Sequence, residues 1–233
     1  MLIPKGALVV PCQARADNPL HGPLHMAAMA GAVEAGGARG IRANGAEDVA
    51  AIRAATALPI IGICKVFDDR FPVYITPDFG SAARIAGAGA GIIAIDATPR
   101  PRDGEPVERL IARIRGELGR EVFADIATPD EGRAAHALGA TYVATTLSGY
   151  TEETASRRGT GPDLELLSAL VAAIPAPVVA EGRFDTPELV AEAFRRGAHA
   201  VVVGTAITNP REITRRFVQA AQGLDNGIGG GWR

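Results

Sequence analysis

Residues able to take part in chemistry end the short apolar runs of this 233-residue chain. They are Gln13, Arg42, Lys65, Asp96, Asp125, Thr145 with Thr146, and Glu181, and the last run ends in Gly204-Thr205-Ala206. If the runs are parallel strands of a barrel, their carboxyl ends bring these side chains to one cavity. Each residue alone is a weak signal, because any strand must end in something polar. Together they predict a mixed-charge site for a small polar substrate.

The segments after the last two runs have the composition of a phosphate site. Gly182 and Gly204 let the backbone approach a ligand closely, and the amides of residues 204–206 with a following helix N-terminus would face an anion. Arg183 and Arg211 can add positive charge nearby. The alternative interpretation is ordinary turn chemistry with an exposed arginine.

The apolar runs that position these residues are too short for helices. They span residues 7–11, 38–41, 60–64, 92–95, 122–124, 142–144, 178–180 and 200–203. Their continuous rather than alternating apolarity is typical of parallel strands that are covered on both faces.

Amphipathic stretches between the runs predict helices at 108–118, 164–174, 188–194 and 213–218. The helix starts share a capping side chain followed by proline at the first helical position. This pattern occurs at Thr76-Pro77, Thr128-Pro129, Thr186-Pro187 and Asn209-Pro210.

An internal period sets the architecture. Gly-Ala pairs that precede an apolar run begin at Gly37, Gly89, Gly139 and Gly197, with separations of 52, 50 and 58 residues. Each interval holds two strand–helix units, so the chain predicts an α/β fold with eight of each, a (β/α)8 TIM barrel. A doubly wound open sheet is the alternative, but no early glycine-rich dinucleotide fingerprint favours it. We expect one catalytic barrel over residues 1–221 and a flexible, glycine-rich tail over 222–233.

Composition excludes several classes of protein. A net charge of −2 argues against a nucleic-acid-binding protein. No apolar run approaches the ~20 residues of a membrane-spanning helix. The first residues show no signal-peptide pattern, so we expect no membrane association and a cytoplasmic location. Two cysteines are too few for a disulfide scaffold or a zinc cluster, and the four histidines have no metal-binding spacing. We expect no metal and no cofactor.

Segments in order along the chain resemble one known family. They are Pro11-Cys12-Gln13-Ala14, Gly40-Ile41-Arg42-Ala43, 59–65, Tyr74-Ile75-Thr76-Pro77, 95–98, Ala124-Asp125-Ile126, 145–151, Ala180-Glu181-Gly182-Arg183 and 203–208. In this combination the chain resembles the N-acetylmannosamine-6-phosphate 2-epimerases, barrel enzymes of sialic acid catabolism. The resemblance covers nearly everything but the tail. It implies a phosphate-binding barrel and an isomerase that interconverts N-acetylmannosamine 6-phosphate and N-acetylglucosamine 6-phosphate.

The resemblance also implies roles for individual residues. Lys65 and Glu181 would be the catalytic pair. Substrate would be bound by Gln13, Arg42, Asp125, Thr146 and Arg183, and its phosphate by Gly182, Gly204, Thr205, Ala206 and Arg211. Two structural readings stay open: Arg42 and Asp125 could form an ion pair across the barrel mouth, and Asp96 could anchor a loop rather than contact the substrate. The expected partner is a small amino-sugar phosphate. We expect no nucleic-acid or membrane partner, and a homodimer stays open as the assembly.

Asn209 departs from the family pattern, which commonly has an arginine there as a phosphate ligand. Because Pro210 follows, Asn209 is typical of a helix cap, and backbone amides or Arg211 would then bind the phosphate. Thr205 also stands where glycine is usual, which tightens the same loop.

The implied reaction removes a proton next to the C1 carbonyl of the open-chain sugar and returns it from the other side. Our hypothesis is that Lys65 is the C2 base, while Glu181 assists proton transfer or orients a sugar hydroxyl. A competing hypothesis makes Lys65 a Schiff-base nucleophile on C1. Burial and Arg42 would lower the pKa of Lys65, whereas a nearby carboxylate would raise it, so the sequence leaves the sign open.

Two alternative functions remain. One is another phosphate-binding barrel enzyme, such as a sugar-phosphate isomerase. The other is a non-catalytic sugar-phosphate sensor. The presence of both Lys65 and Glu181 counts against a sensor, because binding alone needs neither a base nor an acid.

Overall fold

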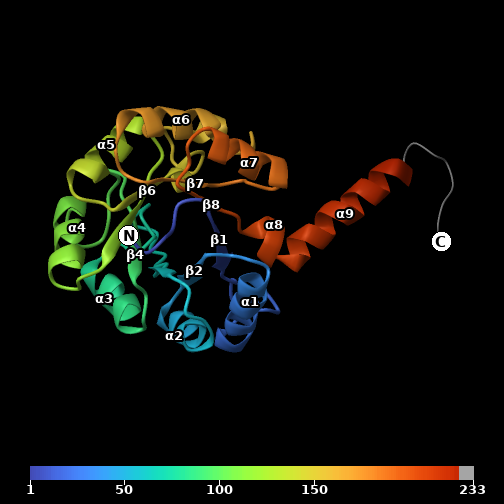
Figure 1. Cartoon of the computed structure of the whole chain (residues 1–233), viewed down its shortest axis with the longest axis horizontal. Coiled ribbons are helices and arrows are strands. Elements are labelled where there is room, and N and C mark those ends of the chain that lie inside the picture. The colour runs from blue at the N-terminus through green and yellow to red at the C-terminus, as the bar shows by residue number, and fades with distance from the viewer. Residues whose placement is uncertain (226–233) are drawn as a thin grey trace.

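Eight parallel strands form a closed barrel in the computed structural model, which describes residues 1–225 (Figure 1). Their order around the barrel follows the chain, and β1 pairs with β8 to close it. The strands are β1 (Ala7–Cys12), β2 (Gly40–Asn44), β3 (Ile60–Ile63), β4 (Ile92–Asp96), β5 (Glu121–Asp125), β6 (Tyr142–Ala144), β7 (Val178–Glu181) and β8 (Ala200–Val202). The predicted (β/α)8 barrel is confirmed, and the open sheet is wrong.

Helices surround the barrel. They are α1 (Pro23–Ala35), α2 (Ala46–Ala55), α3 (Phe79–Gly87), α4 (Val107–Gly116), α5 (Pro129–Ala137), α6 (Leu164–Ala173), α7 (Pro187–Arg195), α8 (Thr205–Thr208) and α9 (Pro210–Asp225). Two 3-10 helices, η1 (Thr145–Leu147) and η2 (Ala155–Arg157), lie between β6 and α6. Within the described residues, no helix is both long and apolar enough to cross a membrane.

The predicted caps hold at three helix starts and fail at one. Thr128 forms a capping box with Glu131 at the start of α5, and Thr186 accepts the Leu189 amide at the start of α7. Asn209 Oδ1 accepts the Glu212 amide at 3.3 Å. Thr76 was expected to cap α3, but Asp78 does so, because the Thr76 hydroxyl instead accepts the Cys64 amide at 3.0 Å.

The repeated Gly-Ala pairs end four helices as predicted. Their glycines have φ between 94° and 110°, a left-handed backbone that favours residues without a Cβ atom. Each therefore reverses the chain at a helix end and feeds it into the next strand.

Two apolar layers bury the strands on both faces. Inside the barrel, Val9, Ile61, Ile92, Phe123 and Val179 are all buried. A larger layer lies between the strands and the surrounding helices and includes the buried thiol of Cys12. This two-sided burial is what the continuous apolar runs predicted.

The predicted helix at 213–218 is part of the longer α9, which projects away from the barrel (Figure 1). Helix α9 extends through residues 222–225, the first four residues of the predicted tail. The remainder of the predicted tail, residues 226–233, lies outside the described residues.

Candidate active site

A cavity of about 650 Å³ lies at the carboxyl ends of the strands. Most of the predicted site residues line it: Gln13, Arg42, Lys65, Thr146, Glu181, Gly182, Arg183, Gly204, Thr205 and Ala206. Asp125 is fully buried behind this lining, in contact with Arg42. Arg211 lies outside the cavity.

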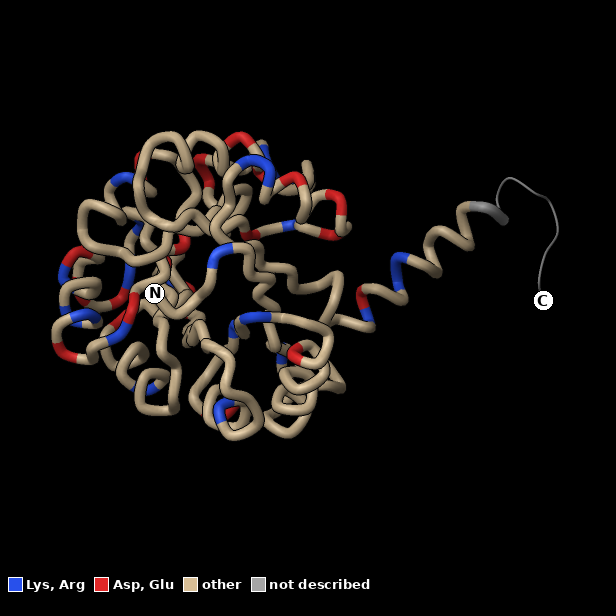
Figure 2. Tube along the Cα trace, viewed as in Figure 1, with Lys and Arg blue, Asp and Glu red and all other residues tan. Residues whose placement is uncertain are grey.

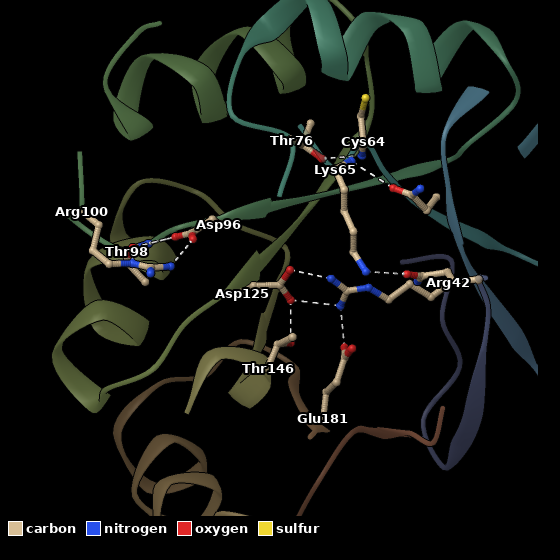
Figure 3. A network of polar contacts seen from close by, with 12 residues as sticks. Arg42, Cys64, Lys65, Thr76, Asp96, Thr98, Arg100, Asp125, Thr146 and Glu181 are labelled. Atoms are coloured by element: carbon tan, nitrogen blue, oxygen red, sulfur yellow. Dashed lines mark hydrogen bonds and ion pairs between the residues drawn. The ribbon is translucent and has the colours of Figure 1, made fainter. Parts of the chain in front are cut away.

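Arg42 organises the charges at the base of the cavity. It lies within β2, not after it, and is 2% exposed. Its Nη1 donates to Asp125 Oδ1 at 3.0 Å and to Glu181 Oε2 at 2.5 Å, and its Nη2 donates to Asp125 Oδ2 at 2.5 Å (Figure 3). Burial opposes the charge, but the two carboxylates outweigh it and raise the pKa of Arg42. Arg42 is therefore a permanent buried cation, and the ion pair with Asp125 is present.

Lys65 enters the cavity from the segment after β3. Its backbone amide donates to Asn44 Oδ1 at 2.9 Å, and its Nζ donates to Gln13 Oε1 at 3.1 Å. Withdrawal from water by the surrounding protein, followed by the charge of Arg42, lowers the pKa of Lys65, although Glu181 opposes this effect. The direction of the pKa shift of Lys65, which the sequence left open, is thus downward. A lower pKa makes a larger fraction of the amine neutral.

Glu181 ends β7 and meets Arg42 from the side opposite Lys65 (Figure 3). Burial raises the pKa of Glu181 to about 7, even though Arg42 lowers it. The Thr145 hydroxyl holds its backbone by accepting the Glu181 amide at 3.0 Å and donating to the Glu181 carbonyl at 2.9 Å. This carboxyl group can therefore exchange a proton near neutral pH.

Thr146 supports the same network. Its hydroxyl donates to Asp125 Oδ1 at 2.6 Å, so Asp125 is held by both Arg42 and Thr146. Thr146 also lines the cavity. At the start of η1, one hydroxyl therefore holds Asp125, and the neighbouring hydroxyl of Thr145 holds the backbone of Glu181.

The predicted phosphate loops border the other side of the cavity. Within the described chain, the amides of Gly204, Thr205 and Ala206 donate to no backbone or side-chain acceptor, so they are free to face a ligand. Gly182 has φ of 114°, which favours glycine. Arg183 lines the cavity, but its guanidinium donates to the carbonyls of Gly161 at 2.5 Å and Ser148 at 2.7 Å. It thereby ties the loops after β6 and β7 together.

Asp96 is a loop anchor. Its carboxylate accepts the amide and hydroxyl of Thr98 at 2.9 and 2.6 Å and pairs with Arg100 at 2.6 Å. It is fully buried and does not line the cavity. Of the two readings of Asp96, the structure supports the structural one.

In residues 1–225, no cluster of three or more His, Cys, Asp or Glu side chains has the geometry to hold a metal ion. Lys and Arg residues are interspersed with Asp and Glu over α4 to α7 (Figure 2).

Comparison with known proteins identifies the family. Residues 26–223 match the family described as "Putative N-acetylmannosamine-6-phosphate epimerase". A relative from Caldanaerobacter subterraneus described as a 2-epimerase of the same kind is 46% identical over 92% of this chain and 90% of its own length. The chain belongs to this epimerase family. A structure of N-acetylmannosamine-6-phosphate 2-epimerase from Clostridium perfringens superposes with a TM-score of 0.90 at 43% identity, covering 94% of each chain.

More distant structures share only the fold. Thiamine phosphate pyrophosphorylase from Pyrococcus furiosus has a TM-score of 0.59 at 18% identity, covering 96% of this chain and 97% of its own. Orotidine 5'-phosphate decarboxylase from Pyrococcus horikoshii has a TM-score of 0.60 at 17% identity, covering 92% and 99%. Nothing in these matches favours another phosphate-binding barrel enzyme over the epimerase.

Asn209 and Arg211 lie at the start of α9, next to the predicted phosphate loop of this member of the epimerase family. Asn209 caps α9, as its neighbouring proline suggested. Arg211, predicted to bind phosphate, pairs with Asp17 at 3.2 Å on the surface. Its guanidinium serves the loop after β1 instead of the cavity.

Several cavity residues were not predicted from the sequence. Arg15, Tyr74, Tyr150 and Arg216 line the cavity without having been assigned to the site. Tyr74 lies in one of the segments that resemble the epimerase family, and Arg15 lies two residues after Gln13, so both carried a sequence signal. Arg216 carried none, because it comes from α9, where the pattern showed only a helix.

Proposed function

We propose that this chain interconverts N-acetylmannosamine 6-phosphate and N-acetylglucosamine 6-phosphate by removing and returning the proton at C2. The observation that carries the proposal is the placement of Lys65 and Glu181 on opposite sides of the buried Arg42 guanidinium (Figure 3). Membership of the epimerase family supports the same reaction.

Lys65 is the C2 base in this proposal. Its lowered pKa increases the neutral fraction of the amine at neutral pH, and only the neutral amine accepts a proton. The hydrogen bond to Gln13 Oε1 keeps the Nζ atom at the cavity. Proton removal moves the C2–H electron pair into the C1–C2 bond and places negative charge on O1.

Arg42 stabilises that charge. A permanent cation in a water-poor site interacts strongly with a developing oxyanion and needs no reorganisation during the reaction. Asp125 and Glu181 hold the guanidinium in place through three hydrogen bonds. Arg42 therefore binds the open-chain sugar near its carbonyl oxygen.

Glu181 returns the proton. Inversion at C2 requires an acid on the face opposite the base, and Glu181 approaches Arg42 from the side opposite Lys65. With a pKa of about 7, close to half of this group is protonated at neutral pH. In the reverse direction, the Glu181 carboxylate takes the proton and the Lys65 ammonium group returns one.

The remaining site residues bind the sugar phosphate. Gln13, Thr146 and Arg183 line the cavity and contact the sugar, and the amides of Gly182, Gly204, Thr205 and Ala206 face the phosphate. The free amides at residues 204–206 support this placement.

One experiment separates this mechanism from its competitors. N-acetylmannosamine 6-phosphate is incubated with the protein in deuterated water, and NMR follows conversion and labelling at C2. Proton transfer predicts conversion with solvent deuterium at C2. Conversion without label contradicts it, and binding with no exchange supports a sensor. A Lys65 adduct trapped by borohydride would support the Schiff base instead.

A homodimer is the assembly we infer from α9. Ile213, Phe217 and Ala221 form an apolar stripe at helical spacing, and Phe217 is 75% exposed. Residues 217–224 carry no charge. Helix α1 also presents an apolar surface, with Leu24 80% exposed and few charged residues (Figure 2). A second copy of the chain would cover both surfaces.

Light scattering after gel filtration tests the dimer. Wild type is expected at twice the mass of the chain, Phe217→Asp at the monomer mass, and Gln219→Asp, on the other face of α9, at the dimer mass. A monomeric wild type contradicts the inference.

A cytoplasmic location is proposed on separate grounds: Cys12 and Cys64 are both free thiols, as expected in a reducing compartment.

A further inference from the structure

Five cationic side chains line the cavity: Arg15, Arg42, Lys65, Arg183 and Arg216. Four of them are engaged within the protein. Arg42 pairs with two carboxylates, Lys65 bonds to Gln13, Arg183 donates to two carbonyls, and Arg216 pairs with Asp185 at 2.9 Å. Within the described part of the chain, no acceptor bonds to the Arg15 guanidinium. Among residues 1–225, Arg15 is therefore the cavity cation that is free for an anionic ligand.

We propose that Arg15 binds the phosphate group of the substrate and sets the preference of this protein for phosphorylated over unphosphorylated sugar. This inference rests on the proposed epimerase function and names the side chain that recognises the phosphate. Arginine suits the role because its planar guanidinium can donate two parallel hydrogen bonds to phosphate oxygens.

The fold places Arg15 next to the phosphate loops. It lies in the loop after β1, and β1 neighbours β8, whose carboxyl end leads into Gly204. The Thr208 hydroxyl donates to the Pro11 carbonyl at 2.8 Å, which joins the end of β1 to α8. These contacts keep the start of the Arg15 loop beside residues 204–206.

Arg211 fixes the far part of the same loop. It pairs with the Asp17 carboxylate at 3.2 Å and donates to the Asp17 carbonyl at 3.3 Å. The loop between β1 and α1 is thus held at its start, where α8 contacts Pro11 near the end of β1, and at Asp17, where α9 contacts it. Arg211, expected to bind phosphate itself, is a positioning residue for the loop that carries Arg15.

The charge of Arg15 also reaches the catalytic lysine. It is among the cations that lower the pKa of Lys65. A phosphate bound by Arg15 would offset that influence, so the phosphorylated substrate and the base are linked through one guanidinium. The other cavity arginines offer no equal candidate, because each is held by a protein acceptor.

The test compares two substrates in three proteins. The kcat/KM values for N-acetylmannosamine 6-phosphate and N-acetylmannosamine are measured for wild type, Arg15→Ala and Arg15→Gln. Loss of a charge-assisted hydrogen bond predicts about a 10- to 100-fold fall with the phosphorylated sugar. This fall is expected to come mainly from a higher KM. The kcat/KM for the unphosphorylated sugar is expected to change by less than about threefold. Arg195→Ala, which removes the same charge from the exposed end of α7, is the matched control.

Two results would overturn the inference: an unchanged preference in both Arg15 variants, or equal losses with both sugars. Inorganic phosphate binding, measured by calorimetry on wild type and Arg15→Ala, provides a readout that does not need turnover. If wild type converts neither sugar, the proposed function fails. Weaker phosphate binding by Arg15→Ala would then still support the anion site, and equal binding would refute it.

Discussion

The two ends of the barrel interior are built from the same strands but differ in charge. At the carboxyl end, β5 and β7 present Asp125 and Glu181 to the buried Arg42 beneath an open cavity. At the amino end, β5 and β6 present Phe123 and Tyr142, which are buried without a net charge. Phe123 and Asp125 are two residues apart and both face inward, because strand side chains alternate. The Arg42 guanidinium lies 5.2 Å from the Phe123 ring, where the two ends meet.

The amino end is closed by the first residues of the chain. Ile3 is buried inside the barrel, its amide donates to the Tyr142 hydroxyl at 3.0 Å, and its carbonyl contacts His199 Nε2 at 2.9 Å. The Tyr142 hydroxyl in turn donates to Glu121 at 3.0 Å. Each polar group named here has a hydrogen-bond partner within the protein. The comparison teaches that apolar packing and hydrogen bonds close the amino end, while the carboxyl end holds buried charges that are available for reactivity.

Lys65→Ala is the change with the largest expected effect on the reactive end. Removal of a general base should lower kcat by about 10³-fold or more. Because the side chain is reached from the cavity, the thermal unfolding temperature should stay close to that of wild type. C2 exchange by NMR and thermal unfolding are the measurements, with Lys5→Ala at the amino end as the control. An active Lys65→Ala protein would remove Lys65 from the mechanism.

Asp125→Ala should have the next largest effect, on stability. It leaves the buried Arg42 with one carboxylate instead of two, and breaking a buried ion pair typically costs about 3–5 kcal/mol. Urea unfolding measures the loss. Asp125→Asn retains an acceptor and should lose less. If the alanine variant is as stable as wild type, Arg42 and its two carboxylates, Asp125 and Glu181, do not form a structural unit.

The pH profile sharpens the role of Glu181. Neutral Lys65 becomes more abundant as pH rises, by about tenfold per pH unit below its pKa. Protonated Glu181 is fully present below a pKa of about 7 and is lost above it. The product of the two fractions predicts that kcat/KM rises to about pH 7 and is then flat until the lysine pKa is reached.

Glu181→Gln separates the two roles considered for this residue. If Glu181 is the acid, the residual activity of the variant continues to rise above pH 7. The change of slope near pH 7 comes from titration of the carboxyl group, which the variant lacks. If the wild-type profile itself rises without a break near pH 7, the proton-donor role is wrong. A role in orienting a sugar hydroxyl would then remain.

Tyr142→Phe is the smallest expected change and tests the amino end. It removes the hydroxyl that joins Ile3 to Glu121 and should lower the free energy of unfolding by about 1–2 kcal/mol. Activity should not change, because Tyr142 lies at the end opposite the cavity. Chemical unfolding and kcat/KM together measure this. A substantial loss of activity at unchanged stability would contradict the division between the two ends.

Local chemistry made much of the fold predictable. The Gly-Ala helix ends were found because glycine alone tolerates the left-handed turn without cost, and the strand ends because apolar runs stop where burial stops. Thr128 and Thr186 were found for the same reason, since a cap depends on neighbouring backbone amides. Thr76 was misassigned because its hydroxyl serves a backbone amide 12 residues away.

The sequence by itself determined which residue types stand at the carboxyl ends of the strands, and so that a cavity there would contain Lys65, Arg42 and Glu181. Only the tertiary structure decided their ionisation and their partners. Burial and charges across the barrel set the direction of the Lys65 pKa and raise that of Glu181 to about 7. Contacts between distant segments direct Arg211 to Asp17 and, as far as the structure describes the chain, leave Arg15 without a protein acceptor in the cavity. Electrostatic interactions depend on distance and burial in space, and neither is written in the order of residues along the chain.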